Sequence, residues 1–246
     1  MKIKNIVFDL DGVLVDTDYF KILRSIGLCH TLLFIIRYLR FPTKNYFFEN
    51  IKHLKRDSQD FATHQGNRIP PIIIDWLSGN DSNKNIKKII QNYLQKINLG
   101  ILERNITNRI SEVVFDPNLL VSTRKLNKNG YSLLLELSER KSYDFYILSN
   151  WDKESFALLK RKYPSIFERA KGIMISGDEH CLKPSKAIYI KFFDRFSLQK
   201  KDTLFIDDEY NNILTLEKMN CHAVHFDKTT YSRKFKDNIL SELFLL

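Results

Sequence analysis

Short apolar segments alternate with amphipathic segments along the C-terminal half of the chain, and this alternation sharply limits the possible folds. Buried strands are predicted at residues 144–150 (DFYILSN), 172–176 (GIMIS), 202–208 (DTLFIDD) and 221–226 (CHAVHF), and helices at 132–140, 153–163, 186–196 and 211–220. Residues 3–8 (IKNIVF) form one more buried strand. Strands that alternate with helices favour a parallel sheet covered on both faces. We therefore expect an α/β fold with a doubly wound, Rossmann-like parallel sheet.

The chain between residues 19 and 117 follows a different pattern. Helical spacing recurs at 20–27, 29–40, 72–78, 85–97 and 102–114, and the segments between these helices contain Pro, Gly and Asn. The insertion contains no segment with the alternation of a strand. Its length is that of a small domain. We therefore expect an all-helical cap domain at 19–117, inserted into an α/β core domain formed by residues 1–18 and 118–246.

Polar side chains follow the predicted strands where each one ends. They are Asp9 and Asp11, Ser149 and Asn150, and Asp207 and Asp208, and Lys183 follows the strand at 172–176. Ligands of open α/β sheets bind beyond the carboxyl ends of the strands. Two carboxylates that are withdrawn from water there have raised pKa values or need a metal or basic side chain beside them, unless both lie in an exposed turn. The sequence therefore predicts a ligand site at this edge, with the insertion lying over it as a lid.

These residue types are suited to binding a metal ion and a phosphate group. Clustered carboxylates can hold Mg²⁺, which keeps several waters and commonly binds one or two carboxylates together with a substrate phosphate. Ser149 and Lys183 are donors suited to phosphate oxygens, and a carboxylate beside the metal can attack phosphorus. Each residue alone has a commonplace alternative, such as a solvated turn, a helix cap or a surface lysine. Their order along the chain and their place at strand ends favour the functional interpretation.

Four segments in this order resemble the motifs of the haloacid dehalogenase superfamily. They are IVFDLDGVLVDT (6–17), YILSN (146–150), the lysine of CLKPSKAIY (181–189) and LFIDDEYNNI (204–213). The resemblance covers residues 1–18 and 118–228 and leaves the insertion unmatched. A helical cap between the first two motifs is typical of one large branch. Within this branch, the spacing of the motif segments is most similar to that of bacterial sugar-phosphate phosphatases such as α-glucose-1-phosphatase.

The resemblance implies a role for each matched residue. Asp9 would be the nucleophile, and Asp11 the general acid and base. Ser149, the backbone around Asn150 and Lys183 would bind phosphate. Mg²⁺ would be held by Asp9, the backbone carbonyl of Asp11, Asp208 and, directly or through water, Asp207. Asn212 falls where many members carry an acid, and a supporting role is implied for it.

The expected function is that of a Mg²⁺-dependent phosphatase acting on a small phosphorylated metabolite, such as a sugar phosphate, through an aspartyl-phosphate intermediate. Two alternatives stay open: a phosphomutase of the same superfamily, and a catalytically weak regulatory or binding protein that retains the fold. A dehalogenase is disfavoured, since that branch lacks the second acid that Asp11 supplies. Arg37, Arg40, His64, Arg68 and Trp76 are candidates for a substrate pocket, although surface or core positions are commoner for such residues.

The net charge of +10 is concentrated in the insertion, since residues 19–120 hold 15 Lys and Arg against 8 Asp and Glu. Such a segment can attract anionic small molecules, RNA or an acidic membrane surface. A nucleic-acid partner is the least supported of these and is not expected. The stretch TLLFIIRYLR (31–40) has the composition of a membrane-surface helix, but a helix packed inside the cap is the commoner case.

No apolar run has the length of a membrane span, and the N-terminus lacks the pattern of a signal peptide. We therefore expect a cytoplasmic protein without a membrane span. Cys29, Cys181 and Cys221 show no metal-binding spacing, so reduced buried thiols are expected rather than disulfides or a zinc site.

Overall fold

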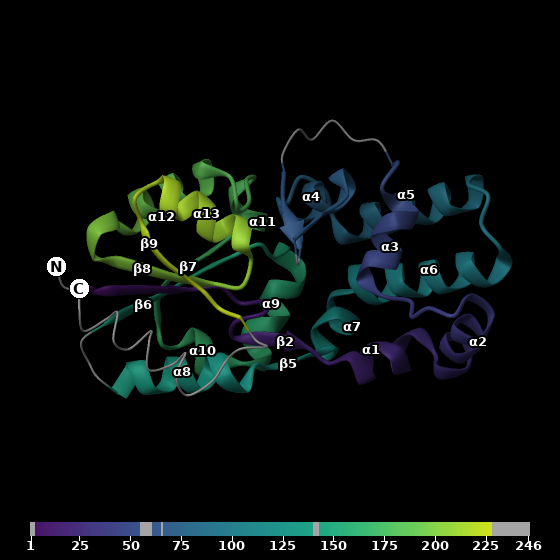
Figure 1. The fold of residues 1–246 in the computed structure, drawn as a ribbon, viewed down its shortest axis with the longest axis horizontal. Helices are drawn as coiled ribbons and strands as arrows, with labels where there is room; N and C mark the ends of the chain where they lie inside the picture. Colours follow the sequence, from purple (N-terminus) through teal and green to yellow (C-terminus); the bar gives the residue numbers. More distant parts are fainter. Residues whose placement is uncertain (1–2, 55–60, 65, 140–142, 228–246) are drawn as a thin grey trace.

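A five-stranded parallel sheet forms the centre of the computed structural model, which describes residues 3–54, 61–64, 66–139 and 143–227. The strand order is β7-β6-β1-β8-β9 (Figure 1). The bounds are β1 (Asn5–Phe8), β6 (Asp144–Ser149), β7 (Ala170–Ile175), β8 (Thr203–Asp207) and β9 (His222–His225). Phe8 pairs with Ile147 on one side and with Ile206 on the other, so β1 lies in the middle of the sheet.

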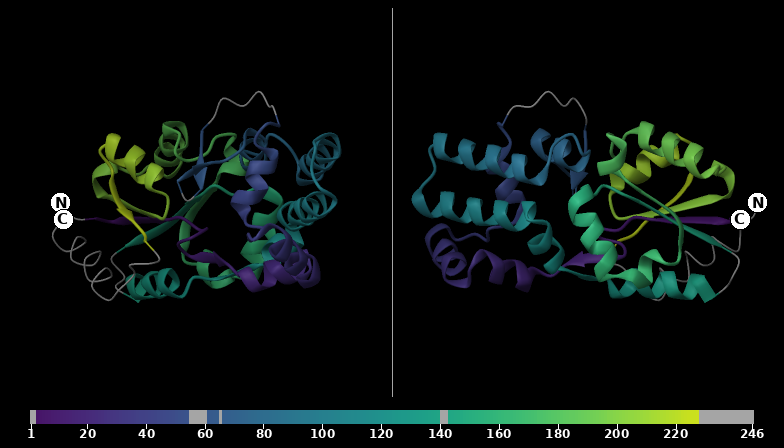
Figure 2. Two further views of the ribbon diagram at one scale, coloured as in Figure 1. Left: turned by 45° about the vertical axis from the view of Figure 1, so that its right-hand side comes forward. Right: turned by 180° about the vertical axis from the view of Figure 1, so that it is seen from behind.

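Helices cover both faces of this sheet (Figure 2). They are α8 (Lys128–Glu139), α9 (Lys153–Lys162), α10 (Pro164–Phe167), α11 (Ser176–Glu179), α12 (Lys186–Phe196), the 3₁₀ helix η1 (Lys200–Asp202) and α13 (Tyr210–Lys218). Ile6 and Phe8 of β1 belong to the hydrophobic cluster that includes α8 and α9, whereas Val7 belongs to the cluster that includes α12 and α13. The prediction of a doubly wound α/β sheet is confirmed.

The insertion between β1 and α8 forms the other end of the molecule (Figure 1). Its elements are α1 (Tyr19–Ile26), α2 (Leu28–Tyr38), α3 (Lys44–Ile51), β3 (Thr63–His64), β4 (Asn67–Arg68), α4 (Pro71–Leu77), α5 (Asn83–Lys96), α6 (Ile101–Phe115) and α7 (Pro117–Ser122). Helices α1 to α7 share a hydrophobic cluster in which the rings of Trp76 and Phe115 meet edge to face, 4.9 Å apart. The division of the chain into two domains at residues 18 and 118 stays a prediction.

The insertion differs from the expected all-helical segment by a short hairpin. An antiparallel hairpin pairs Thr63 with Arg68 and His64 with Asn67. Strands of two residues are too short to produce a visible alternation in the sequence. Helix α3 was also not expected, although Thr43 caps it by accepting a hydrogen bond from the backbone N–H of Tyr46 at 3.2 Å.

Two antiparallel strands connect the sheet with the insertion. They are β2 (Val15–Thr17) on the outward path and β5 (Arg124–Leu126) on the return path. Thr17 is paired with Arg124 in this register. The pairing places Arg124, which is far from the first motif in the sequence, beside the chain that follows Asp11.

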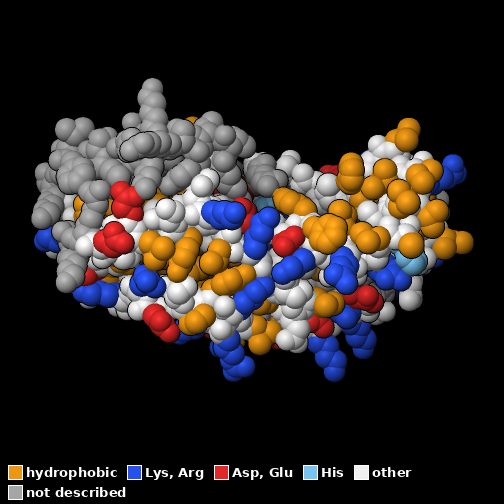
Figure 3. Space-filling model, turned by 90° about the horizontal axis from the view of Figure 1, so that it is seen from below, with side chains coloured by type: hydrophobic (Ala, Val, Ile, Leu, Met, Phe, Trp, Pro, Cys, Tyr) orange, Lys and Arg blue, Asp and Glu red, His pale blue; other side chains and the backbone are white. Residues whose placement is uncertain are grey.

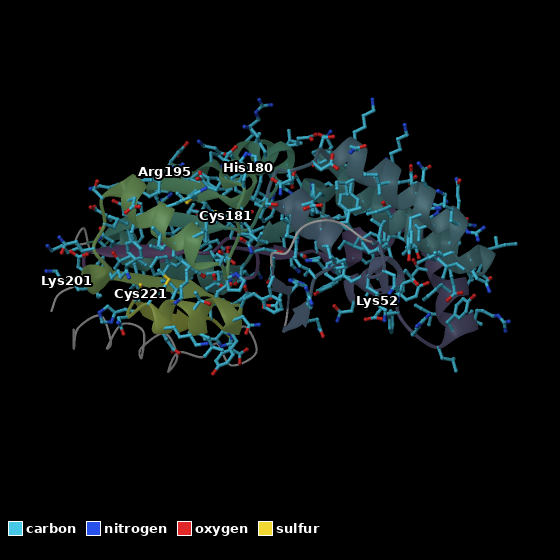
Figure 4. All side chains as sticks on the ribbon, turned by 90° about the horizontal axis from the view of Figure 1, so that it is seen from above. Lys52, His180, Cys181, Arg195, Lys201 and Cys221 are labelled. Atoms are coloured by element: carbon cyan, nitrogen blue, oxygen red, sulfur yellow. The ribbon has the colours of Figure 1, made fainter. Side chains whose placement is uncertain are left out.

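No single helix in the described ranges is long and apolar enough to cross a bilayer. Helices α1 and α2 meet that criterion only when taken together, and their axes are bent by 94°. No disulfide joins Cys29, Cys181 and Cys221. Cys221 is buried and Cys181 is partly buried in the sheet-containing half (Figure 4), but Cys29 is exposed on α2, so the expectation of burial was wrong for Cys29.

Candidate active site

Lys183 lies between two acidic side chains at the carboxyl edge of the sheet. Its Nζ is 3.0 Å from Oδ1 of Asp9, which follows β1, and 2.6 Å from Oδ2 of Asp207, which ends β8. All three side chains are buried. Ser149 ends β6 and is also buried. The sheet order sets β1 between β6 and β8, so side chains that are far apart in the sequence meet at one point.

The electrostatics of this cluster are dominated by burial. Desolvation raises the pKa of Asp9 to about 7; the Lys183 ammonium opposes this shift and the Asp207 carboxylate adds to it. Burial alone would lower the pKa of Lys183, but the Asp207 and Asp9 carboxylates outweigh it and raise the pKa above its usual value. Lys183 therefore stays charged, and a further cation beside Asp9 would stabilise the carboxylate form of Asp9.

The carboxylates of Asp9, Asp207 and Asp208 form the acidic cluster of the site, with one oxygen of each within 4.8 Å of the others. Asp207 accepts hydrogen bonds at Oδ1 from the backbone N–H of Glu209 and from Nδ2 of Asn212, both at 2.9 Å. The amide of Asn212 thus donates a hydrogen bond to Asp207, whereas an acidic side chain at position 212 would repel the Asp207 carboxylate. Such a set of oxygens fits a hard divalent cation.

Gly12, which completes the DLDG sequence, makes room for Asp208. Its φ angle is +91°, in the region that favours glycine, and a Cβ at this position would lie 1.9 Å from Oδ2 of Asp208. The carboxylate of Asp208 therefore rests against the backbone of the turn that carries Asp9 and Asp11.

Ser149 and Asn150 are placed differently from each other. The Ser149 hydroxyl is buried and has no hydrogen-bond partner among the described residues; it lies close enough to Asp9 to favour its carboxylate form, but outside hydrogen-bond geometry. The Asn150 side chain donates to the carbonyl of Lys183 and accepts from its N–H, both at 2.8 Å. Asn150 thereby fixes the backbone of Lys183, and contact of the Asn150 backbone with phosphate stays a prediction.

Asp11 is paired with Arg124, a residue that the sequence motifs did not indicate. Nη1 of Arg124 lies 3.1 Å from Oδ1 of Asp11 and also donates to Oγ1 of Thr17. The guanidinium lies over the ring of Trp151, 5.4 Å from its centroid. A single arginine in a basic chain is normally at the surface, so only the pairing of β2 with β5 reveals it.

A cavity joins these residues to the insertion. Its walls on the insertion side are formed by Lys44, Phe48, Thr63, His64, Ile69, Ile73, Trp76, Leu77 and Val114. Of the candidates from the sequence, His64 and Trp76 line the cavity, whereas Arg37, Arg40 and Arg68 are not among its lining residues. Glu209 connects the two sides: its carboxylate lies 3.7 Å from Nδ1 of His64 and 3.4 Å from Oγ1 of Thr63. The β3–β4 hairpin therefore closes the cavity against the segment that follows β8.

The family model of haloacid dehalogenase-like hydrolases matches residues 3–220, which includes every residue of this cluster. The chain belongs to this family. The match spans the insertion as well as the four motif segments. Membership identifies the protein as a hydrolase.

Solved structures of haloacid dehalogenase-like proteins share the fold over nearly the whole chain. An enzyme of this family from Bacteroides thetaiotaomicron, solved with magnesium and inorganic phosphate, has a TM-score of 0.60 at 18% identity, covering 95% of this chain and 99% of that one. A predicted hydrolase of the family from Porphyromonas gingivalis has a TM-score of 0.61 at 20% identity, with 98% of both chains covered. A predicted phosphoglycolate phosphatase from Haemophilus somnus has a TM-score of 0.51 at 17% identity, covering 92% and 85%.

Proposed function

We propose that this protein is a Mg²⁺-dependent phosphatase that hydrolyses a small phosphorylated metabolite through an aspartyl-phosphate on Asp9. The observation that carries the proposal is the contact of Asp9 with Lys183 at 3.0 Å, beside the buried Ser149 hydroxyl that has no partner within the described residues. A phosphate group would supply the acceptor that this hydroxyl needs and the negative charge that Lys183 would neutralise.

The reaction has two half-reactions. An oxygen of Asp9 attacks phosphorus, the bond between phosphorus and the leaving oxygen breaks, and Asp11 gives that oxygen a proton. Asp11 then takes a proton from water, the water oxygen bonds to phosphorus, and the bond from Asp9 to phosphorus breaks to release inorganic phosphate. Lys183 lies against Asp9 in both steps and offsets the charge of the phosphoryl oxygens. Arg124 holds Asp11 on the side of the connecting strands.

Asp9, Asp208 and the backbone carbonyl of Asp11 are the groups that we propose to hold Mg²⁺, with Asp207 beside them. The acidic cluster supports this set, and Asp207 already receives three hydrogen bonds, which favours an indirect contact for it. When bound, the cation would neutralise negative charge on the phosphoryl group and on Asp9.

The residues that line the cavity indicate which class of substrate it can bind. Apolar side chains predominate in the wall that the insertion forms. Lys44 is the lysine that the described part of the insertion contributes to this wall. Lys44 is exposed to water, and desolvation by the surrounding protein lowers the pKa of its ammonium, an effect that the Asp11 carboxylate opposes. This composition favours a leaving group with an apolar body and a second anionic group over a fully hydroxylated sugar.

Replacing Lys44 with Met tests this substrate class. We expect KM to rise about 5- to 20-fold for phosphomonoesters that carry a second anionic group, with a smaller change in kcat, because a uniform binding contact is lost. Lys52→Met is the matched control, since Lys52, labelled in Figure 4, lies just beyond α3 and pairs with Glu49 at 2.6 Å on the surface. Equal KM values for Lys44→Met and the parent protein would remove Lys44 from the substrate site.

Replacing Asp208 with Asn tests the metal site. We expect the Kd for Mg²⁺, measured by calorimetry, to rise at least about 10-fold, and phosphate release to fall with it, because one charged ligand becomes neutral at nearly constant shape. The variant keeps the shape that rests against Gly12. Unchanged Mg²⁺ affinity would show that the cation is held elsewhere.

The function itself is tested by a screen for phosphate release with and without Mg²⁺. The panel contains sugar phosphates, short phosphorylated carboxylic acids and phosphomonoesters with apolar leaving groups. We expect Mg²⁺-dependent release that chelation abolishes. Substrate conversion to an isomer without phosphate release would favour the phosphomutase alternative, and no conversion across the panel would favour the binding protein.

A further inference from the structure

Helix α2 carries apolar side chains on its outside as well as its inside. Thr31 and Phe34 are buried against the rest of the insertion. Leu28, Leu32, Leu33 and Ile36 form a second stripe, and between 53% and 65% of the surface of each is exposed. A surface helix normally presents polar and charged side chains opposite its buried face. The outer stripe of α2 therefore lacks a cover within the described part of the chain.

Further apolar side chains are exposed on α1 and just after α2. Tyr19 and Phe20 of α1 are 68% and 66% exposed, and Leu39 and Phe41 after α2 are 89% and 62% exposed. Figure 3 shows orange side chains gathered at the end of the molecule that the insertion forms. Single exposed apolar residues are normal, but a set of this size marks an interaction site. We call these eight residues the α1–α2 outer face.

The charged side chains on the segment that forms the α1–α2 outer face have one sign. Residues 19–41 contain four Lys and Arg and no Asp or Glu. Lys21, Arg24 and Arg37 are exposed on α1 and α2. Arg40 is partly neutralised by Glu103, 3.3 Å away. A second copy docked through the same face would bring these cations together, which disfavours self-association, whereas an anionic partner is attracted.

We propose that the α1–α2 outer face lies on an anionic membrane surface. Apolar side chains bordered by Lys and Arg are what an interfacial helix needs, since the apolar groups enter the acyl boundary and the cations meet anionic head groups. The two helices do not form a span in this fold, because they bend by 94° at Gly27 and their inner residues Ile26 and Phe34 belong to the core of the insertion. The helix pair lies on the surface of the bilayer.

Sedimentation with vesicles tests this proposal on the full chain. We expect binding to vesicles of phosphatidylglycerol and phosphatidylcholine, weaker binding at high salt, and little binding to vesicles of phosphatidylcholine alone. The double variant Leu32→Gln, Ile36→Gln should bind at least about 10-fold more weakly, since two apolar side chains leave the interface. Arg24→Gln should weaken binding about fivefold.

Ile190→Gln is the matched control, because Ile190 is 51% exposed on α12 in the other half of the molecule. Its binding should equal that of the parent protein. Because all the replaced side chains are exposed, each variant should unfold at the same temperature as the parent. Binding that the double variant retains, or no binding to anionic vesicles, overturns the proposal. A dimer in sedimentation velocity that the double variant loses, without vesicle binding, assigns the face to a second copy instead.

Discussion

Asp9→Asn is expected to lower phosphate release by at least about 10³-fold, because the amide cannot form the bond to phosphorus that the carboxylate forms. The substitution keeps the shape of a side chain that is 8% exposed and lies 3.0 Å from Nζ of Lys183. The loss should therefore appear in kcat, measured by phosphate release, while the circular dichroism spectrum stays that of the parent.

Asp18→Asn provides the matched control for this change. Asp18 is the N-cap of α1 and accepts from the backbone N–H of Lys21, and Asn serves equally well as an N-cap. The control should keep its activity. If Asp9→Asn turns over substrate as fast as Asp18→Asn, Asp9 is not the nucleophile.

Lys183→Met is expected to lower both activity and stability. Lys183 is 2% exposed, and its removal leaves the Asp9 and Asp207 carboxylates buried without their counter-charge. Breaking a buried ion pair from one side costs about 3–5 kcal/mol of unfolding free energy. Activity should fall by at least about 10²-fold, because charge neutralisation at the phosphoryl group is lost. Urea unfolding without Mg²⁺ measures the first effect, and phosphate release the second.

Lys171→Met is the control, because it removes an ammonium group that is exposed rather than buried. Lys171 pairs with Asp144 at 2.7 Å, but its side chain is 60% exposed. A surface pair of this kind contributes little because water screens it, so this variant should unfold almost as the parent does. Equal unfolding free energies for Lys183→Met and Lys171→Met would contradict the account of a buried cluster held by Lys183.

The sheet and the residues at its edge could be predicted from the sequence for a physical reason. Buried parallel strands are short apolar runs, and the polar residue that ends each run must lie at the ligand-binding edge. Asp9, Ser149 and Asp207 occupy such positions, and the structure brings them together. The catalytic and binding roles of these residues stay predictions until the variants are measured.

The positions of Lys44 and Arg124 in the site could not be predicted from the sequence in the same way. Lys44 and Arg124 are single cations in a basic chain, and no local pattern distinguishes them from surface residues. Arg124 reaches Asp11 only because β5 pairs with β2, and Lys44 reaches the cavity only because Thr43 starts α3 at that point. Both depend on contacts between distant segments, which periodicity cannot report.

The aspartyl-phosphate on Asp9 is tested most directly by mass spectrometry of the protein after acid quenching during turnover with Mg²⁺ and a substrate from the screen. We expect one added phosphoryl group on the peptide that contains Asp9, and none on that peptide in Asp9→Asn. A phosphoryl group on another residue, or turnover without any phosphoryl-enzyme in the parent protein, would contradict the role of Asp9 as the nucleophile.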